Sequence, residues 1–336
     1  MKNQTAMDRN FKARTINLIE KIGDFWTLGI FFLIVLVFTL IEPKFFSVPY
    51  WSSTLVYLSE VLLLGVAETF VIITAGIDLS VGAIEGFIGI VTALLIKALV
   101  PVVGPVGAII LGILIGLFVG AIIGYINGKV VTKMHITPFI ATLGMMGILT
   151  GLTFILANGT DIVGLPLEMG KIGNIMICNI FGLATIVSWS IAIIGYIMLS
   201  KTRFGIYTYA IGSNAEASRR SGINVDRHLV KVYMFSAVTS AVAGILMILR
   251  FNTASPLTGS NINMSAVAAV VIGGTSLMGG TGNIFGSVIG AAIISILITG
   301  LVMINVQPFW QTVAIGVIII LAVYIDQLRH KNEQAS

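Results

Sequence analysis

The chain has 336 residues, of which 57% are hydrophobic and only 10% are charged. A soluble domain carries about 25% charged residues, so this composition excludes a water-soluble globular protein and indicates an integral membrane protein. The formal net charge is +5, and the single cysteine, Cys178, excludes an internal disulfide.

Apolar stretches predict about ten membrane-spanning helices, because one span needs about 20 mostly apolar residues. The first stretch follows a basic tail over 1–24. It is longer than a signal-peptide core and no small-x-small cleavage site follows it, so we expect it to be retained as a span. Residues 326–336 form a second polar tail. The division of 251–325 rests on glycines, polar residues and length, since this region has no Asp, Glu, Lys, Arg or His. The expected spans are 25–41, 55–75, 81–100, 106–126, 137–156, 175–199, 231–249, 264–279, 284–305 and 309–325.

The basic residues predict the orientation of these spans. With the N-terminus placed in the cytoplasm, fifteen of the 19 Lys and Arg residues fall on the cytoplasmic side. This positive-inside bias predicts that both tails and a large basic loop over 201–228 are cytoplasmic. The four remaining basic residues fall outside or near the outer end of a span, at Lys44, Lys97, Lys171 and Arg250.

Two carboxylates, Asp78 and Glu85, interrupt the apolar stretch VIITAGIDLSVGAIEG at 71–86. A charge at membrane depth is costly and needs a reason. In one interpretation Gly76 ends a helix, and Asp78 or Ser80 caps the next one in a tight turn at the cytoplasmic ends of two spans. In the other, the stretch is a re-entrant break that lines a substrate path. The positive-inside bias favours the turn, and both interpretations stay open.

The sequence contains no catalytic or metal-binding constellation. His135, His228 and His330 are scattered, and neither an H-E-x-x-H motif nor paired cysteines occur. GGTGNIFG at 279–286 lies between apolar stretches without the strand–turn–helix context of a nucleotide-binding loop, so it predicts close helix packing or a tight turn. The phosphate-loop motif is absent as well. We therefore expect no enzymatic activity, no cofactor, no metal and no ATP hydrolysis by this chain itself.

Residues 71–86 and 271–286 share a weak internal similarity at an offset of 200 residues. Val, Ile, Gly, Ile and Gly recur at equivalent positions. Five matches among sixteen apolar positions indicate either an internal repeat or chance.

The basic loop over 201–228 contains a predicted short helix. Asn214 is a suitable N-cap, AEASRR follows it, and Gly222 is a suitable stop. A short helix presented by a membrane domain suits docking into a cytoplasmic partner. A basic loop that merely faces lipid is the alternative interpretation.

Four motifs together resemble the ribose/galactose-type family of ABC sugar permeases, and they follow the family's order and spacing over most of the chain. They are GIDLSVG (76–82), TPFIATLGMM (137–146), KTRFGIYTYAIGSNAEASRRSGINV (201–225) and AVAAVVIGGTSLMGG (266–280). The resemblance implies an all-α polytopic membrane protein with the type II ABC importer permease fold, related to the vitamin B12 importer. It also implies a second permease copy or paralogue, a cytoplasmic ATP-binding subunit and an extracytoplasmic sugar-binding protein, all assembled at a bacterial cytoplasmic membrane.

The resemblance places the family's ATPase-coupling loop at 212–222. Glu216 and Arg219 are three residues apart, so we expect them to share a helix face. The expected coupling residues are Gly212, Asn214, Glu216, Ala217, Arg219, Arg220 and Gly222. The candidate residues of the translocation pathway are Asp78, Ser80, Glu85, Phe139, Thr142, Asn263 and Ser265.

The chain departs from the family pattern at two places. Asn263, Met264 and Ser265 stand where the family usually carries an acidic pair, and Glu85 stands where it usually has an apolar or small residue. Ribose is therefore not carried over as the substrate.

The predicted function is that of the permease subunit of an ATP-driven, binding-protein-dependent importer for a monosaccharide or small polyol. The alternative is a proton-coupled secondary transporter that uses intramembrane carboxylates as relays. Uptake that survives ATP depletion but not a protonophore would favour this alternative. The candidate relays are Glu60, Glu68, Asp78 and Glu85.

Overall fold

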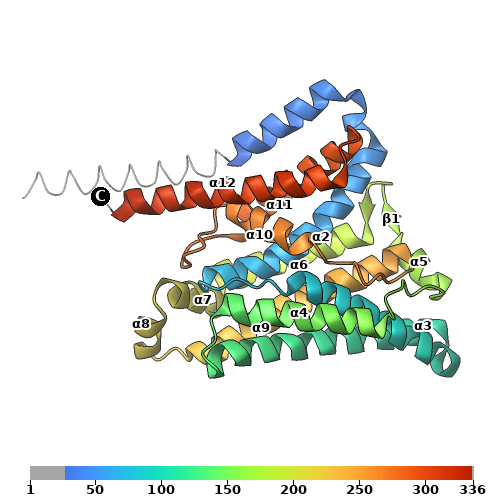
Figure 1. The fold of residues 1–336 in the computed structure, drawn as a ribbon, viewed down its shortest axis with the longest axis horizontal. Helices are drawn as coiled ribbons and strands as arrows, with labels where there is room; N and C mark the ends of the chain where they lie inside the picture. Colours follow the sequence, from blue (N-terminus) through green and yellow to red (C-terminus); the bar gives the residue numbers. More distant parts are fainter. Residues whose placement is uncertain (1–26, 335–336) are drawn as a thin grey trace, which may run out of the picture.

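The computed structural model describes residues 27–334, and these are mostly helical (Figure 1). The tail predicted for 1–24 lies outside the described residues. The first element is the helix Thr27–Ile41. It is followed by η1 (Pro43–Phe46), α2 (Val48–Ile73), α3 (Val81–Lys133), α4 (Pro138–Leu156), α5 (Leu167–Gly173), β1 (Met176–Ile177), β2 (Phe181–Gly182), α6 (Leu183–Lys201), α7 (Arg203–Ser213), α8 (Ala215–Arg220), α9 (Val225–Phe251), α10 (Ile262–Ile272), α11 (Ile284–Met303) and α12 (Pro308–Gln334).

Six of the described helices are long and apolar enough to cross a membrane, namely α2, α3, α4, α6, α9 and α11. Three shorter apolar helices, Thr27–Ile41, α10 and Pro308–Tyr324 within α12, accompany them. The 53-residue α3 contains two of the predicted spans, because the backbone leaves the helix at Gly104, where φ is 73°. Pro101 and Pro105 flank this kink, and proline removes a helical N–H donor. The structure thus supports a polytopic membrane fold without establishing ten spans.

The span predicted for 264–279 is wrong, because this segment does not form one continuous helix. The helix α10 has only 11 residues and ends at Ile272, and irregular backbone precedes and follows it. The preceding segment, 252–261, packs directly against α3, since a Cβ added at Gly82 would lie 2.2 Å from the carbonyl oxygen of Gly259. A Cβ at Gly86 would lie 2.4 Å from the carbonyl oxygen of Thr258. Irregular backbone at membrane depth is tolerated where protein buries it or where it lines a cavity.

The span predicted for 175–199 also starts too early. Its first residues form the two-stranded antiparallel hairpin of β1 and β2, in which Met176 pairs with Gly182. The helix α6 begins only at Leu183.

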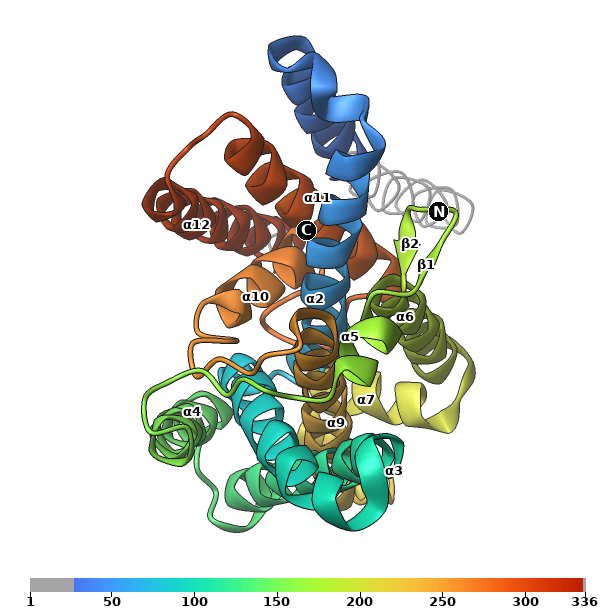
Figure 2. The ribbon, with the colours of Figure 1, turned by 90° about the vertical axis from the view of Figure 1, so that its right-hand side faces the viewer.

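The helices α3 and α9 pack closely through glycines on α3. Glycines recur at a spacing of four from 112 to 128; Gly120, Gly124 and Gly128 face α9, whereas the first two lie mainly against the first half of α3. A Cβ at Gly124 would lie 2.4 Å from the carbonyl oxygen of Tyr233, and one at Gly128 would lie 2.6 Å from the Cα of Val230. Small residues at this spacing let membrane helices approach closely. The helix α2, most of whose residues are buried, runs through the middle of the bundle (Figure 2).

Candidate translocation site and coupling segment

The break between α2 and α3 is organised around the buried side chain of Asp78. One carboxylate oxygen of Asp78 accepts hydrogen bonds from the backbone N–H of Ser80 at 2.9 Å and from its hydroxyl at 2.5 Å. The other oxygen accepts a hydrogen bond from the Ser236 hydroxyl on α9 at 3.2 Å. Asn127, near the end of α3, donates to the Ser80 hydroxyl at 2.9 Å. Through these hydrogen bonds, the Asp78 carboxylate and the Ser80 hydroxyl connect the start of α3 with the end of the same helix and with α9.

The Asp78 carboxylate stabilises a tight turn before α3 rather than capping the helix, because the N–H that it accepts belongs to Ser80. Asp78 binds the N–H of the residue that precedes α3, whereas Ser80, the N-cap residue, makes no side-chain capping bond. The predicted capping by Ser80 is therefore wrong, because its hydroxyl is engaged by Asp78 and Asn127.

Replacement of Asp78 tests this interpretation. Asp78→Asn keeps an oxygen that can accept the Ser80 N–H, so we expect stability and transport close to those of the wild type. Asp78→Ala removes the acceptor and should lower the free energy of unfolding by about 0.5–2 kcal/mol. Thermal unfolding of the purified protein and uptake in cells measure the two effects. A well-folded Asp78→Asn protein without transport would instead show that the charge is required.

A cavity of about 230 Å³ lies between α3, α4 and the irregular segment before α10. None of the residues that line it is charged, and five carry a neutral hydroxyl or amide. Such groups bind a polyol through hydrogen bonds without demanding a charge on it. The lining residues are Ala83, Gly86, Met146, Thr150, Thr153, Pro256, Thr258, Gly259, Ser260 and Asn263.

The candidate pathway residues divide between this cavity and its surroundings. Asn263 lines the cavity, and its side-chain amide lies 3.4 Å from the carbonyl oxygen of Leu79. The hydroxyl of Thr142 donates to the Ile77 carbonyl and accepts the Leu79 N–H, each at 3.1 Å, so it supports the break.

Three other candidates do not line the cavity. Ser265 is buried in α10, beside Tyr57. Glu85 is buried in α3, beside Glu60 of α2. Phe139 is 49% exposed on α4.

Sequence reasoning missed the hydroxyl groups of the cavity. Thr150 and Thr153 lie three residues apart in the otherwise apolar helix α4, which places both on one face. This spacing was a usable signal. No comparable spacing marks Thr258 and Ser260, because their position depends on how the irregular segment packs against α3.

The short helix α8 has the predicted form and lies at one end of the molecule (Figure 1). The Asn214 side chain accepts the backbone N–H of Ala217 at 2.8 Å. Gly222 has a φ of 87°, a conformation that L side chains rarely adopt. Glu216 and Arg219 were expected to share a helix face, and they do not pair with each other: Arg219 pairs with Asp226 at 3.1 Å. Glu216 pairs with Arg220 at 3.1 Å, one turn further along the helix.

The helix α7 connects α8 to both irregular breaks in the bundle. A Cβ added at Gly212 would lie 1.7 Å from the carbonyl oxygen of Ile73 and 2.6 Å from the backbone nitrogen of Gly280. These two groups are themselves joined, since the Gly280 N–H donates to the Ile73 carbonyl at 2.9 Å. Tyr209 of α7 donates its hydroxyl to the Gly282 carbonyl at 2.7 Å. Burial raises the pKa of Tyr209, which keeps the hydroxyl protonated as a donor.

The two breaks correspond to the weak internal similarity in the sequence. The helix α2 ends at Ile73 and α3 begins at Val81, whereas α10 ends at Ile272 and α11 begins at Ile284. The same order of helix, break and helix thus occurs twice, and the two breaks meet at α7.

Among the described residues, no group of three or more His, Cys, Asp or Glu side chains could hold a metal ion. A bundle of apolar helices around an uncharged, hydroxyl-lined cavity suits a membrane transport protein of the permease class.

Comparisons with known proteins agree with this class. Residues 50–323 match the family model described as "Branched-chain amino acid transport system / permease component". A ribose import permease of Bacillus subtilis (strain 168) is 38% identical, over 97% of this chain and 99% of the relative. A D-allose transport system permease of Escherichia coli (strain K12) is 36% identical, over 93% of each chain. A fructose import permease of Rhizobium meliloti is 35% identical, over 88% of this chain and 84% of the relative.

The chain therefore belongs to the ribose/galactose-type family of ABC permeases that its motifs indicated. No solved structure matched it.

Proposed function

We propose that this chain is the permease subunit of an ATP-driven, binding-protein-dependent importer for a monosaccharide or a similar small polyol. The relatives named for ribose, allose and fructose import support this substrate class. The observation that carries the mechanism is the contact of α7 with both breaks, through Gly212 and Tyr209. A movement of α8 would reach α2 and α11 together through this contact.

In this proposal α8 docks into a cytoplasmic ATP-binding subunit. The Glu216 and Arg220 side chains are 66% and 80% exposed, so both remain accessible to a partner although they pair with each other. Arg219 is held by Asp226 at 3.1 Å and helps to fix α8 on α9. The loop 201–228, both tails and the ATP-binding subunit then lie on the cytoplasmic side of a bacterial cytoplasmic membrane, as the positive-inside bias predicts.

The substrate would pass along the segment 252–261 and α10. Leu257 and Met264 are exposed apolar side chains next to the cavity residues Thr258 and Asn263. A second copy or a paralogue facing this surface would cover them and complete a path in the type II importer fold. An extracytoplasmic sugar-binding protein would deliver the substrate to the opposite end from α8.

This function is favoured over proton-coupled transport. The relatives are import permeases of this ABC family. The hydrogen bonds that Asp78, one candidate proton relay, accepts from Ser80 and Ser236 support a structural role for it.

Replacement of Asn263 tests the proposed path. Asn263→Ala removes the only amide that lines the cavity. One lost neutral hydrogen bond costs about 0.5–1.5 kcal/mol, so we expect the uptake efficiency kcat/KM to fall about 2- to 12-fold at unchanged expression. Ser190→Ala is the matched control, because the Ser190 hydroxyl is exposed and bonds only within α6. If Asn263→Ala and Thr258→Val both transport with normal kinetics, the cavity is not on the path.

A further inference from the structure

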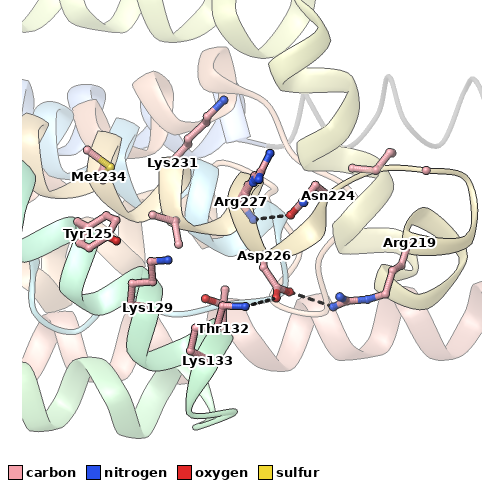
Figure 3. Close-up of a pocket in the computed structure, with 13 residues that line it drawn as sticks. Tyr125, Lys129, Thr132, Lys133, Arg219, Asn224, Asp226, Arg227, Lys231 and Met234 are labelled. Atoms are coloured by element: carbon pink, nitrogen blue, oxygen red, sulfur yellow. Dashed lines mark hydrogen bonds and ion pairs between the residues drawn. The ribbon is translucent and has the colours of Figure 1, made fainter.

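A second and larger cavity, of about 760 Å³, opens where the end of α3 meets the start of α9, next to α8 (Figure 3). Its lining is strongly basic. Asp226 is the only acidic residue among those that line it. The basic residues are Lys129, Lys133, Arg219, Arg227 and Lys231.

Asp226 neutralises only one side of this groove. Its carboxylate pairs with Arg219 at 3.1 Å and with Lys133 at 3.7 Å, as the dashed lines in Figure 3 mark. Among the described residues, the remaining three cations form no ion pair with a carboxylate. An anion bound in the groove would supply the counter-charge that these cations lack. These three cations are Lys129, Arg227 and Lys231.

The other wall of the groove is apolar. Tyr125, Val230 and Met234 line it, and the ammonium group of Lys129 lies 5.2 Å from the centre of the Tyr125 ring. Tyr125 also continues an exposed apolar stripe on α3, formed with Phe118 and Ile122. Residues spaced by three and four lie on one helix face, so the stripe and Lys129 share one face of α3. The surface thus combines an apolar stripe with a group of positive charges at one end of it.

We propose that this groove binds the headgroup of one anionic phospholipid, with the acyl chains lying along the Phe118–Tyr125 stripe. Basic pockets between membrane helices on the cytoplasmic side suit such headgroups. An acidic segment of a partner protein would also satisfy the cations. The apolar stripe favours lipid, because it lies on α3, a helix long and apolar enough to cross a membrane. The proposal does not depend on docking of α8.

The test uses the purified full-length permease, with phosphatidylglycerol and phosphatidylcholine as probes. We expect native mass spectrometry to show one phosphatidylglycerol retained per chain, and phosphatidylglycerol to raise Tm more than phosphatidylcholine does. The variant Lys129→Gln/Lys231→Gln removes two unpaired cations. Each basic residue near an anionic lipid surface contributes about 1 kcal/mol, so retention should weaken about five-fold for each lysine removed. The matched control, Lys201→Gln/Arg203→Gln, removes two exposed cations outside the groove and should behave as the wild type.

Three results would overturn the proposal. The first is equal retention of both lipids by the wild type, and the second is unchanged retention of phosphatidylglycerol by the groove variant. The third is an equal rise in Tm with inorganic phosphate alone, which would assign the groove to a free anion. Loss of co-purification of an ATP-binding subunit from the groove variant, with lipid retention unchanged, would assign the groove to a protein partner instead.

Discussion

Gly212→Val is expected to abolish uptake while the permease is still inserted in the membrane. Even a Cβ at this position would lie 1.7 Å from the Ile73 carbonyl oxygen and 2.6 Å from the Gly280 nitrogen. Both obstacles are backbone atoms, so no side-chain rotation relieves the clash and α7 must move away from the two breaks. Overpacking of this kind costs about 1–3 kcal/mol or more. Uptake at equal membrane expression is the measurement.

A milder variant keeps this prediction testable if valine disturbs folding. Tyr209→Phe retains the ring and removes only the hydroxyl that binds the Gly282 carbonyl. It should lower the free energy of unfolding by about 0.5–1.5 kcal/mol and should reduce uptake. Tyr207→Phe, on the more exposed side of α7, is the control and should transport normally. Normal uptake by both Gly212→Val and Tyr209→Phe would show that α7 does not transmit movement to the breaks.

Variants of the α8 tip are expected to leave a folded permease whose partner ATPase no longer responds to substrate. Arg220→Glu reverses a charge on an exposed side chain. Gly222→Val forces a β-branched residue to adopt a φ of 87°, which displaces the end of α8. Both changes alter the surface that α8 would present to the proposed ATP-binding subunit, so stimulated ATP hydrolysis should fall to the basal rate. Lys171→Glu reverses an exposed charge in α5, far from α8 in the fold, and should have no effect (Figure 1).

The local features of α8 could be predicted from the sequence because they depend on neighbouring residues. An N-cap at Asn214 and a left-handed glycine at Gly222 are determined within one turn of the helix. The pairing of Glu216 was less predictable, because spacings of three and four both place residues on one face. In the structure, Asp226 from the next helix forms an ion pair with Arg219, and Glu216 forms one with Arg220.

The region 252–283 could not be predicted in the same way. It contains no charged residue, so neither hydropathy nor the positive-inside rule marks where the helix α10 begins and ends. Its course is set by contacts with distant segments, such as the approach of Gly259 to Gly82 and the hydrogen bond from Gly280 to Ile73. The candidate cavity depends on this course, which explains why only Asn263 among its lining residues was expected.

The measurement that tests the central claim most directly uses proteoliposomes containing the permease, the proposed ATP-binding subunit and the proposed binding protein. ATP hydrolysis and uptake of a labelled sugar are followed together. The account predicts that sugar-loaded binding protein stimulates hydrolysis with the wild type but not with Arg220→Glu or Gly222→Val, and that uptake requires ATP and survives a protonophore. Uptake that persists without ATP and collapses with a protonophore, together with normal stimulation in both variants, would contradict it.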